Sequence, residues 1–146
     1  MVIGIIGENC TGKSTLAKAV SAALGAETVT GKDYLRMAKT ENEAAQLFRH
    51  KLKAAVEGES VIYVISEKEQ VSFLPEGAVK VLVTAELDAI KERFRARMHG
   101  NLPAPVEMML EKKHGMFDDG DYQLRYHSGR DDMDATVKSI LSYGDK

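Results

Sequence analysis

Apolar and polar positions come in alternating blocks along the chain, and the blocks predict strands separated by helices. The continuous apolar run at 2–6 is typical of a strand that is buried on both faces, and further strands are expected at 61–65 and 79–83. A weaker strand is expected at 27–30 and an alternating one at 122–127. Because strands that alternate with helices form parallel sheets, the pattern predicts an α/β fold with a five-stranded, mainly parallel sheet in three α/β/α layers.

Between the strands, apolar residues recur with a helical period. The first helix is expected over 13–24, with Gly25 as its stop signal. Thr40 with Glu43 forms a capping box for a helix that ends near Gly58. Further helices are expected from about 86 to 100 with Thr84 as cap, over about 106–114, and after Asp131 or Asp132. The buried stripe of the second helix is expected to hold Ala44, Leu47, Phe48, Leu52, Ala55 and Val56.

Composition narrows the class of protein. The 146 residues fit one domain over 1–146, and the net charge of -2 argues against a nonspecific nucleic-acid binder. The single cysteine excludes an internal disulfide, and no apolar run reaches the roughly 20 residues of a membrane span. We therefore expect a cytoplasmic monomer or weak homodimer that binds neither nucleic acid nor membrane.

The segment Gly7–Ser14 matches the phosphate-loop pattern G-x-x-x-x-G-K-[ST] at every fixed position. Glycines let successive backbone amides converge on a phosphate, and the following helix presents its amino end to the same anion. Lys13 supplies the cation for the β- and γ-phosphates, and Ser14 a hard oxygen ligand for Mg²⁺. The motif follows an apolar strand and opens a helix, as its function requires. The sequence thus predicts a P-loop NTPase fold that uses ATP and Mg²⁺, the alternative being a glycine-rich turn without a ligand.

Eight loop and helix residues are expected to contact the nucleotide. Thr15, in the first helical turn, is expected near the α-phosphate, and Cys10 is interpreted as inert loop filler. The predicted ATP contacts are Gly7, Asn9, Cys10, Thr11, Gly12, Lys13, Ser14 and Thr15.

A cluster of arginines ends the helix expected at 86–100. Its apolar stripe places Arg93 and Arg97 at one border of the buried face, whereas Arg95 points away. With the Pro103–Pro105 break and the returning helix, the segment at about 93–116 resembles a hairpin lid. Arg93 and Arg97 are then candidate catalytic cations over the transferring phosphoryl group, beside Lys13. The alternative is a solvated basic helix end.

The chain resembles the cytidylate kinase-like branch of the nucleoside monophosphate kinases. The resemblance covers the phosphate loop, the stretch 30–36, the strand-lid-strand segment and the last strand with its capped helix. It implies that Arg36 holds the phosphate of the acceptor, that Arg93 and Arg97 are lid arginines, and that Arg130 packs against adenine. Small-molecule kinases also place an Asp after the second strand, which gives Asp33 a catalytic role and a contact with the acceptor. An N-terminal helix cap is the alternative for Asp33.

The chain departs from this family after the third strand. The family's D-G-R-D-like stretch is replaced by Ser66-Glu67-Lys68-Glu69, and the strand-end Asp that supports Mg²⁺ is missing. Glu67, Glu69 or Asp33 can substitute for it. Three functions stay open: a kinase acting on a nucleoside monophosphate or similar small metabolite, a hydroxyl-acceptor kinase of the shikimate or gluconate type, and a catalytically weak ATP-binding sensor or interaction module.

Overall fold

The computed structural model describes residues 1–144, and within them strands alternate with helices. No helix in this range is long and apolar enough to cross a membrane. The strands are β1 (Val2–Ile6), β2 (Glu27–Thr30), β3 (Val61–Ile65), β4 (Val79–Thr84) and β5 (Leu124–His127). The helices are α1 (Lys13–Leu24), α2 (Glu41–Ala55), α3 (Lys68–Val71), α4 (Leu87–Arg97), α5 (Ala104–Lys113) and α6 (Met133–Gly144), with a 3-10 helix η1 (Asp33–Met37).

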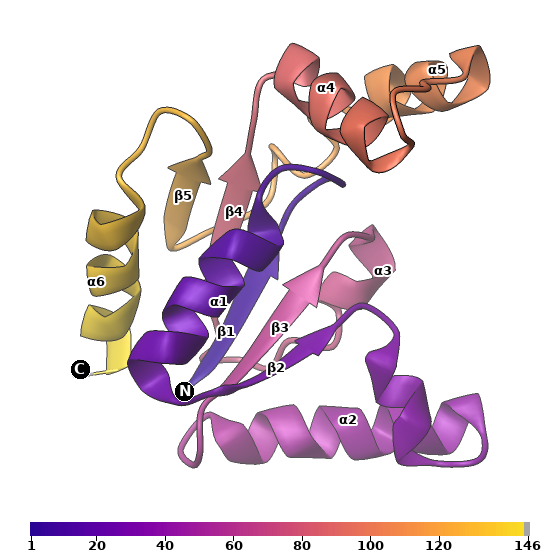
Figure 1. The fold of residues 1–146 in the computed structure, drawn as a ribbon. Helices are drawn as coiled ribbons and strands as arrows, with labels where there is room; N and C mark the ends of the chain where they lie inside the picture. Colours follow the sequence, from indigo (N-terminus) through magenta and orange to yellow (C-terminus); the bar gives the residue numbers. More distant parts are fainter. Residues whose placement is uncertain (145–146) are drawn as a thin grey trace.

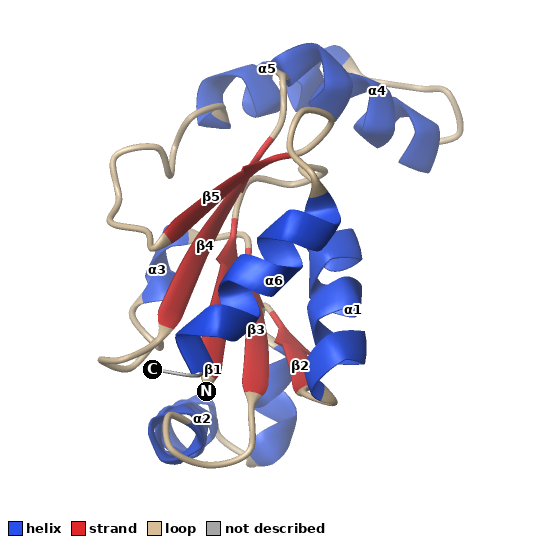
Figure 2. Cartoon of the chain, turned by 90° about the vertical axis from the view of Figure 1, so that its left-hand side faces the viewer, coloured by secondary structure: helices blue, strands red, loops and turns tan. Residues whose placement is uncertain are grey.

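The strands form one five-stranded sheet in the order β2-β3-β1-β4-β5, in which every neighbouring pair is parallel. Helices α1 and α6 cover one face of the sheet and α2 and α3 the other (Figures 1 and 2). Helices α4 and α5 lie beyond the carboxyl ends of the strands, at the top of both views. The predicted three-layer α/β/α arrangement is therefore confirmed.

The central strand β1 contributes to both cores because successive side chains of a strand point to opposite faces. Val2 and Ile6 pack on the side of α2, where Phe48 is fully buried. Ile3 and Ile5 pack on the side of α1 and α6. Burial on both faces explains why this strand appears as an unbroken apolar run in the sequence.

Most predicted element bounds are confirmed, and two assignments are wrong. Thr40 Oγ1 accepts from Glu43 N–H at 3.2 Å, and Asp132 Oδ1 caps α6 by accepting from Asp134 N–H at 3.0 Å. Leu47 was expected in the buried stripe of α2 but is 47% exposed, since it lies at the border of the stripe. Thr84 does not cap α4: it ends β4, and its hydroxyl lies 2.8 Å from Nδ1 of His127.

Candidate functional site

The crossover pattern of the sheet opens a crevice at the carboxyl ends of β1 and β3. After β1 the chain continues toward the edge of the sheet formed by β2, whereas after β3 it continues toward the opposite edge, through β4. Ligands of open α/β sheets bind at such a switch point. The loop 7–12 leaves β1 at this point, and Ser66 and Glu67 follow β3 beside it.

The phosphate loop is held in shape by its glycines. Gly7 N–H donates to Ile65 O at 3.1 Å, and a Cβ on Gly7 would lie only 2.4 Å from Val83 O. Gly12 has φ +102°, a value that L side chains rarely adopt, and Cys10 carries a positive φ of 63°. The loop thus curls tightly between two strands, which leaves its amides and the first turn of α1 as a cradle for an anion.

Lys13 is a buried cation at the base of this cradle. It is 7% exposed, and its Nζ donates to the backbone oxygen of Glu8 at 2.5 Å. The pKa of Lys13 is lowered from 10.5 to about 8, mainly by burial and in part by nearby Arg97, against the opposing effects of Cys10 and Glu8. The charges that surround the Lys13 ammonium group thus do not fully offset the cost of burying its positive charge. An anionic ligand at this position would offset it.

The other predicted loop residues divide into two groups. Thr11 is buried, and its hydroxyl donates to Glu8 O at 2.9 Å, so it serves the loop's own structure. Ser14 and Thr15 are exposed in the first turn of α1. An exposed hydroxyl next to a lysine in a glycine-formed cradle fits the chemistry of a Mg²⁺-triphosphate complex.

Arg93 reaches from α4 to the phosphate loop. Its guanidinium donates to Cys10 O at 3.0 Å and to Ser128 Oγ at 2.7 Å. Arg97 lies one turn further along, near enough to Lys13 to lower its pKa. Arg95 instead pairs with Glu92 on its own helix. The structure therefore brings Arg93 and Arg97 to the loop and turns Arg95 away, as the helical pattern predicted.

A hollow of about 450 Å³ opens beside these arginines. It is lined by Cys10, Gly12, Thr15, Arg93, Ala96, Arg97, Tyr126, Ser128 and Met133. Arg130, which was expected near the nucleotide base, is not among the lining residues. Its side chain is 69% exposed and donates to Glu86 Oε1 at 2.6 Å.

Asp33 and Arg36 lie on η1, which is anchored by an aromatic cluster. Tyr34 is buried and stacks on Phe48 with ring centroids 5.1 Å apart. Burial raises the pKa of Tyr63, and the charges of Tyr34, Asp33 and Glu67 add to this effect, so both carboxylates lie near the Tyr63 hydroxyl. Arg36 is exposed. Asp33 is exposed as well, and it lies two residues after Gly31, whose backbone oxygen accepts from the Tyr63 hydroxyl at 2.8 Å.

The turn after β3 places one of its two glutamates near the phosphate loop. Glu67 forms a capping box with Gln70 at the start of α3 and shares a small cavity with Glu8 and Asn9. Glu69 is exposed on α3. Among the carboxylates considered as Mg²⁺ support, Glu67 therefore shares a cavity with the loop, and Glu69 is not among the residues that line this cavity.

Several residues at the site were missed by the sequence analysis. Glu8 accepts hydrogen bonds from the end of α5, and Ser128 receives Arg93. Glu8 occupies a variable position of the loop motif, and Ser128 lies in a polar turn without a motif. Neither position carried a signal, because its role depends on contacts more than 30 residues away.

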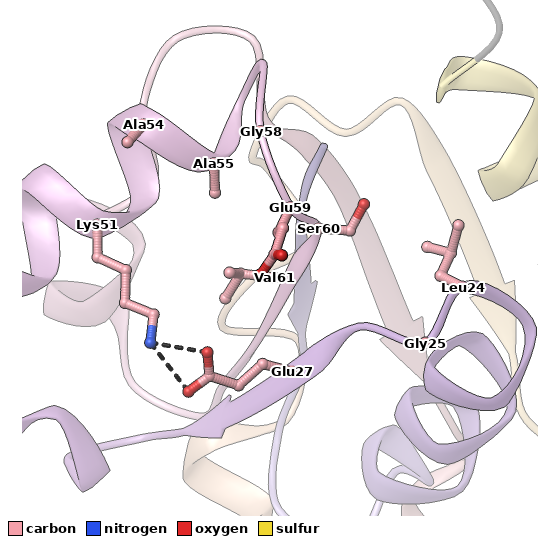
Figure 3. Close-up of a pocket in the computed structure, with 10 residues that line it drawn as sticks. All are labelled: Leu24, Gly25, Glu27, Lys51, Ala54, Ala55, Gly58, Glu59, Ser60 and Val61. Atoms are coloured by element: carbon pink, nitrogen blue, oxygen red, sulfur yellow. Dashed lines mark hydrogen bonds and ion pairs between the residues drawn. The ribbon is translucent and has the colours of Figure 1, made fainter.

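A second hollow, of about 660 Å³, lies at the opposite edge of the sheet, at the amino ends of β2 and β3 (Figure 3). Its charged side chains include Lys51 and Glu27, which pair with each other at 2.7 Å. Since the phosphate loop follows the carboxyl end of β1, this hollow is not part of the candidate site.

The fold has close counterparts among solved structures, although no protein-family model and no curated protein matches the chain. A putative kinase from Chloroflexus aurantiacus is 17% identical, with a TM-score of 0.67 and 97% of each chain covered. Shikimate kinase from Bacteroides thetaiotaomicron is 18% identical, with a TM-score of 0.62, 100% of this chain and 99% of that one covered. The YorR protein from Bacillus subtilis, solved with phosphorylated GDP, is 23% identical, with a TM-score of 0.63 and coverages of 99% and 96%.

At these identities the likeness establishes the fold and nothing finer. The chain has the α/β fold of P-loop kinases. The cytidylate kinase-like branch stays a prediction.

Proposed function

We propose that the protein is an ATP- and Mg²⁺-dependent kinase that transfers the γ-phosphate to a small metabolite. The observation that carries this proposal is the convergence of Lys13 and Arg93 on one phosphate loop from elements 80 residues apart in the chain. Phosphoryl transfer is catalysed mainly by positioning and by neutralising charge on the transferring group. The buried Lys13, with Arg93 and Arg97 beside it, supplies that charge.

In this proposal the loop amides and Lys13 hold the β- and γ-phosphates, and Ser14 and Glu67 are the residues that would hold Mg²⁺. Held there, Mg²⁺ would supply positive charge against that of the phosphates. Arg93 and Arg97 stabilise the transferring group. The hollow lined by Tyr126 and Met133 takes the base and ribose.

The acceptor is proposed to lie between η1 and the β3–α3 turn. A nucleoside monophosphate, as in the cytidylate kinase-like branch, would place its phosphate on Arg36. A hydroxyl acceptor is favoured by a separate observation, the position of Asp33 near Glu67 and Tyr63. A carboxylate at that point can orient the attacking hydroxyl and take its proton.

An acceptor panel with Mg·ATP tests the proposal, and two variants separate the acceptor classes. The panel should include nucleoside monophosphates, sugars and hydroxy acids, with ADP formation as the readout. With a phosphate acceptor, Arg36→Ala is expected to raise the KM of the acceptor at least tenfold, whereas Asp33→Asn changes it little. With an alcohol acceptor, Asp33→Asn is expected to lower kcat about a hundredfold or more.

A catalytically weak ATP-binding sensor is the competing function. ATP binding by calorimetry without ADP formation on any acceptor in the panel would favour it over the kinase. Turnover near 1 s⁻¹ or faster, about the lower end of ordinary enzymes, would exclude it.

A further inference from the structure

The lid hairpin, defined here as residues 87–115, contacts the phosphate loop at two places, once from α4 and once just after α5. From α4, Arg93 donates to Cys10 O at 3.0 Å. From the end of α5, Gly115 N–H donates to Glu8 Oε2 at 3.0 Å, and His114 Nδ1 lies 3.1 Å from Glu8 Oε1. The contact at Cys10 uses a backbone oxygen, whereas the contact at Glu8 depends on a side chain at a variable position of the motif.

The two lid helices are joined to each other, which makes the hairpin a unit. Lys91 of α4 pairs with Glu107 at 3.2 Å and Glu111 at 2.6 Å, both on α5. Beneath them, Ile90 and Leu110 are buried against Cys10 of the loop. The two helices are therefore held to each other and to Cys10, whereas His114 and Gly115, which follow α5, depend on Glu8 for their contact with the loop.

Glu8 links this hairpin to the phosphate-binding lysine. Its backbone oxygen accepts from Lys13 Nζ at 2.5 Å, while its carboxylate, with only 11% of the side chain exposed, holds the residues that follow α5. A hydrogen bond to a charged and poorly solvated acceptor is stronger than one between neutral groups. The carboxylate of Glu8 is thus suited to fix the hairpin's C-terminal end.

We propose that Glu8 is a positioning residue that attaches the C-terminal end of the lid to the phosphate loop, so that an occupied loop and a docked lid stabilise each other. Such coupling is reciprocal: if a docked lid favours the nucleotide, the nucleotide favours the docked lid. The attachment of the lid through Glu8 is independent of the proposed function. The dependence of this attachment on nucleotide rests on the proposed function.

Amide hydrogen exchange on the full chain tests the attachment without any assay of activity. Glu8→Ala is expected to speed exchange at Gly115 about tenfold or more, the size expected for losing a hydrogen bond to a charged group. Glu8→Gln keeps the shape and an oxygen for Gly115 N–H but loses the charge, so a rise of roughly threefold is expected. The matched control is Glu92→Gln, which removes an exposed lid carboxylate that pairs with Arg95 on its own helix and should leave exchange at Gly115 unchanged.

An unchanged rate at Gly115 in Glu8→Ala overturns the proposal. If that variant fails to fold, as judged by circular dichroism, Glu8→Gln decides the question. A rate in Glu8→Gln equal to that of the unmodified protein would then overturn the attachment.

The second measurement adds the non-hydrolysable analogue Mg·AMP-PNP. In the unmodified protein it is expected to slow exchange over both 87–97 and Gly115. In Glu8→Ala the analogue should slow exchange over 87–97 alone, because only the Arg93 attachment remains.

A merely structural role for Glu8 would keep the response to the analogue both over 87–97 and at Gly115, and that result overturns the coupling. No response anywhere in the unmodified protein would count against nucleotide binding, and with it against the coupling, while the first measurement still decides the attachment.

Discussion

At the scale of single residues, the protonation of the buried Lys13 ammonium group has the largest effect on the site. Burial holds the pKa of Lys13 at about 8, well below its usual 10.5. A buried cation costs stability in the folded protein and is favourable only when an anion compensates it. The sequence motif gave the position and role of this lysine, but its resting partner, the Glu8 carbonyl, follows from a loop geometry that the motif does not specify.

Replacing Lys13 with methionine should separate stability from binding. Lys13→Met is expected to raise the free energy of unfolding by about 2 kcal/mol at pH 7, since a charged group with a lowered pKa is removed from the interior. Affinity for Mg·AMP-PNP should fall at least a hundredfold. Thermal denaturation and calorimetry measure the two effects, with Lys18→Met on the exposed side of α1 as control. A variant that is less stable and still binds would contradict this account.

The sign of the stability effect depends on pH. Below pH 8 Lys13 is protonated in the folded and the unfolded chain, so its burial cost is complete. Between about 8 and 10.5 the unfolded chain binds more protons, so stability rises with pH. The gain from Lys13→Met should therefore shrink across this range.

The loss of the Lys13 proton should also lower the affinity for nucleotide, although it raises the stability of the folded protein. Because neutral Lys13 offers no charge to a phosphate, the dissociation constant of Mg·AMP-PNP is expected to rise above pH 8, approaching about tenfold per pH unit. Calorimetry from pH 6.5 to about 9.5 measures it. A dissociation constant that stays level through this interval would show that Lys13 keeps its proton.

At the scale of elements, buried strands and amphipathic helices were predicted well, whereas two short helical elements were missed. The bounds of α1, β1 and β3 were predicted because buried strands and an amphipathic helix leave clear patterns. The short elements η1 and α3 have four or five residues and no period, and both depend on tertiary contacts, such as the stacking of Tyr34 on Phe48. Since η1 carries Asp33 and Arg36, the acceptor side of the site was the part least accessible to sequence reasoning.

The orientation of α4 gives a matched pair of arginine substitutions. Arg93→Ala is expected to lower kcat for phosphoryl transfer about a hundredfold or more, the effect of removing a preorganised cation from a transition state. Arg95→Ala removes an equal charge from the same helix, but Arg95 pairs with Glu92 away from the loop, so kcat should stay within about twofold. Steady-state kinetics with the acceptor identified in the panel measures both. Equal losses in the two variants would mean that α4 acts through its overall charge.

At the scale of the whole molecule, the parallel sheet and both cores position the loop, so ligand binding and global stability are linked. A ligand that binds only the folded state at a concentration 100 times its dissociation constant stabilises it by about 2.7 kcal/mol. The sequence predicted this sheet from its apolar runs, whereas the joining of α4 and α5 to the loop depends on side chains that no pattern specifies.

We expect Mg·AMP-PNP at that excess to raise the melting temperature by about 5–10 °C, given the size of the chain. Differential scanning calorimetry measures the shift. Lys13→Met should show almost none, which separates binding at the loop from nonspecific stabilisation. A shift of equal size in Lys13→Met would place the ligand elsewhere.

The central place of β1 in the sheet also has a consequence for biosynthesis. Residues 2–6 are made before both of the strands with which they pair, 61–65 and 79–82, and Gly7 needs Ile65 for its backbone hydrogen bond. At about 5–20 residues per second, the first strand waits several seconds on the ribosome before either neighbour exists. The phosphate loop is therefore synthesised before the strands that hold it in shape. Until those strands are made, the apolar strand β1 has no partner and is open to chaperones and to aggregation.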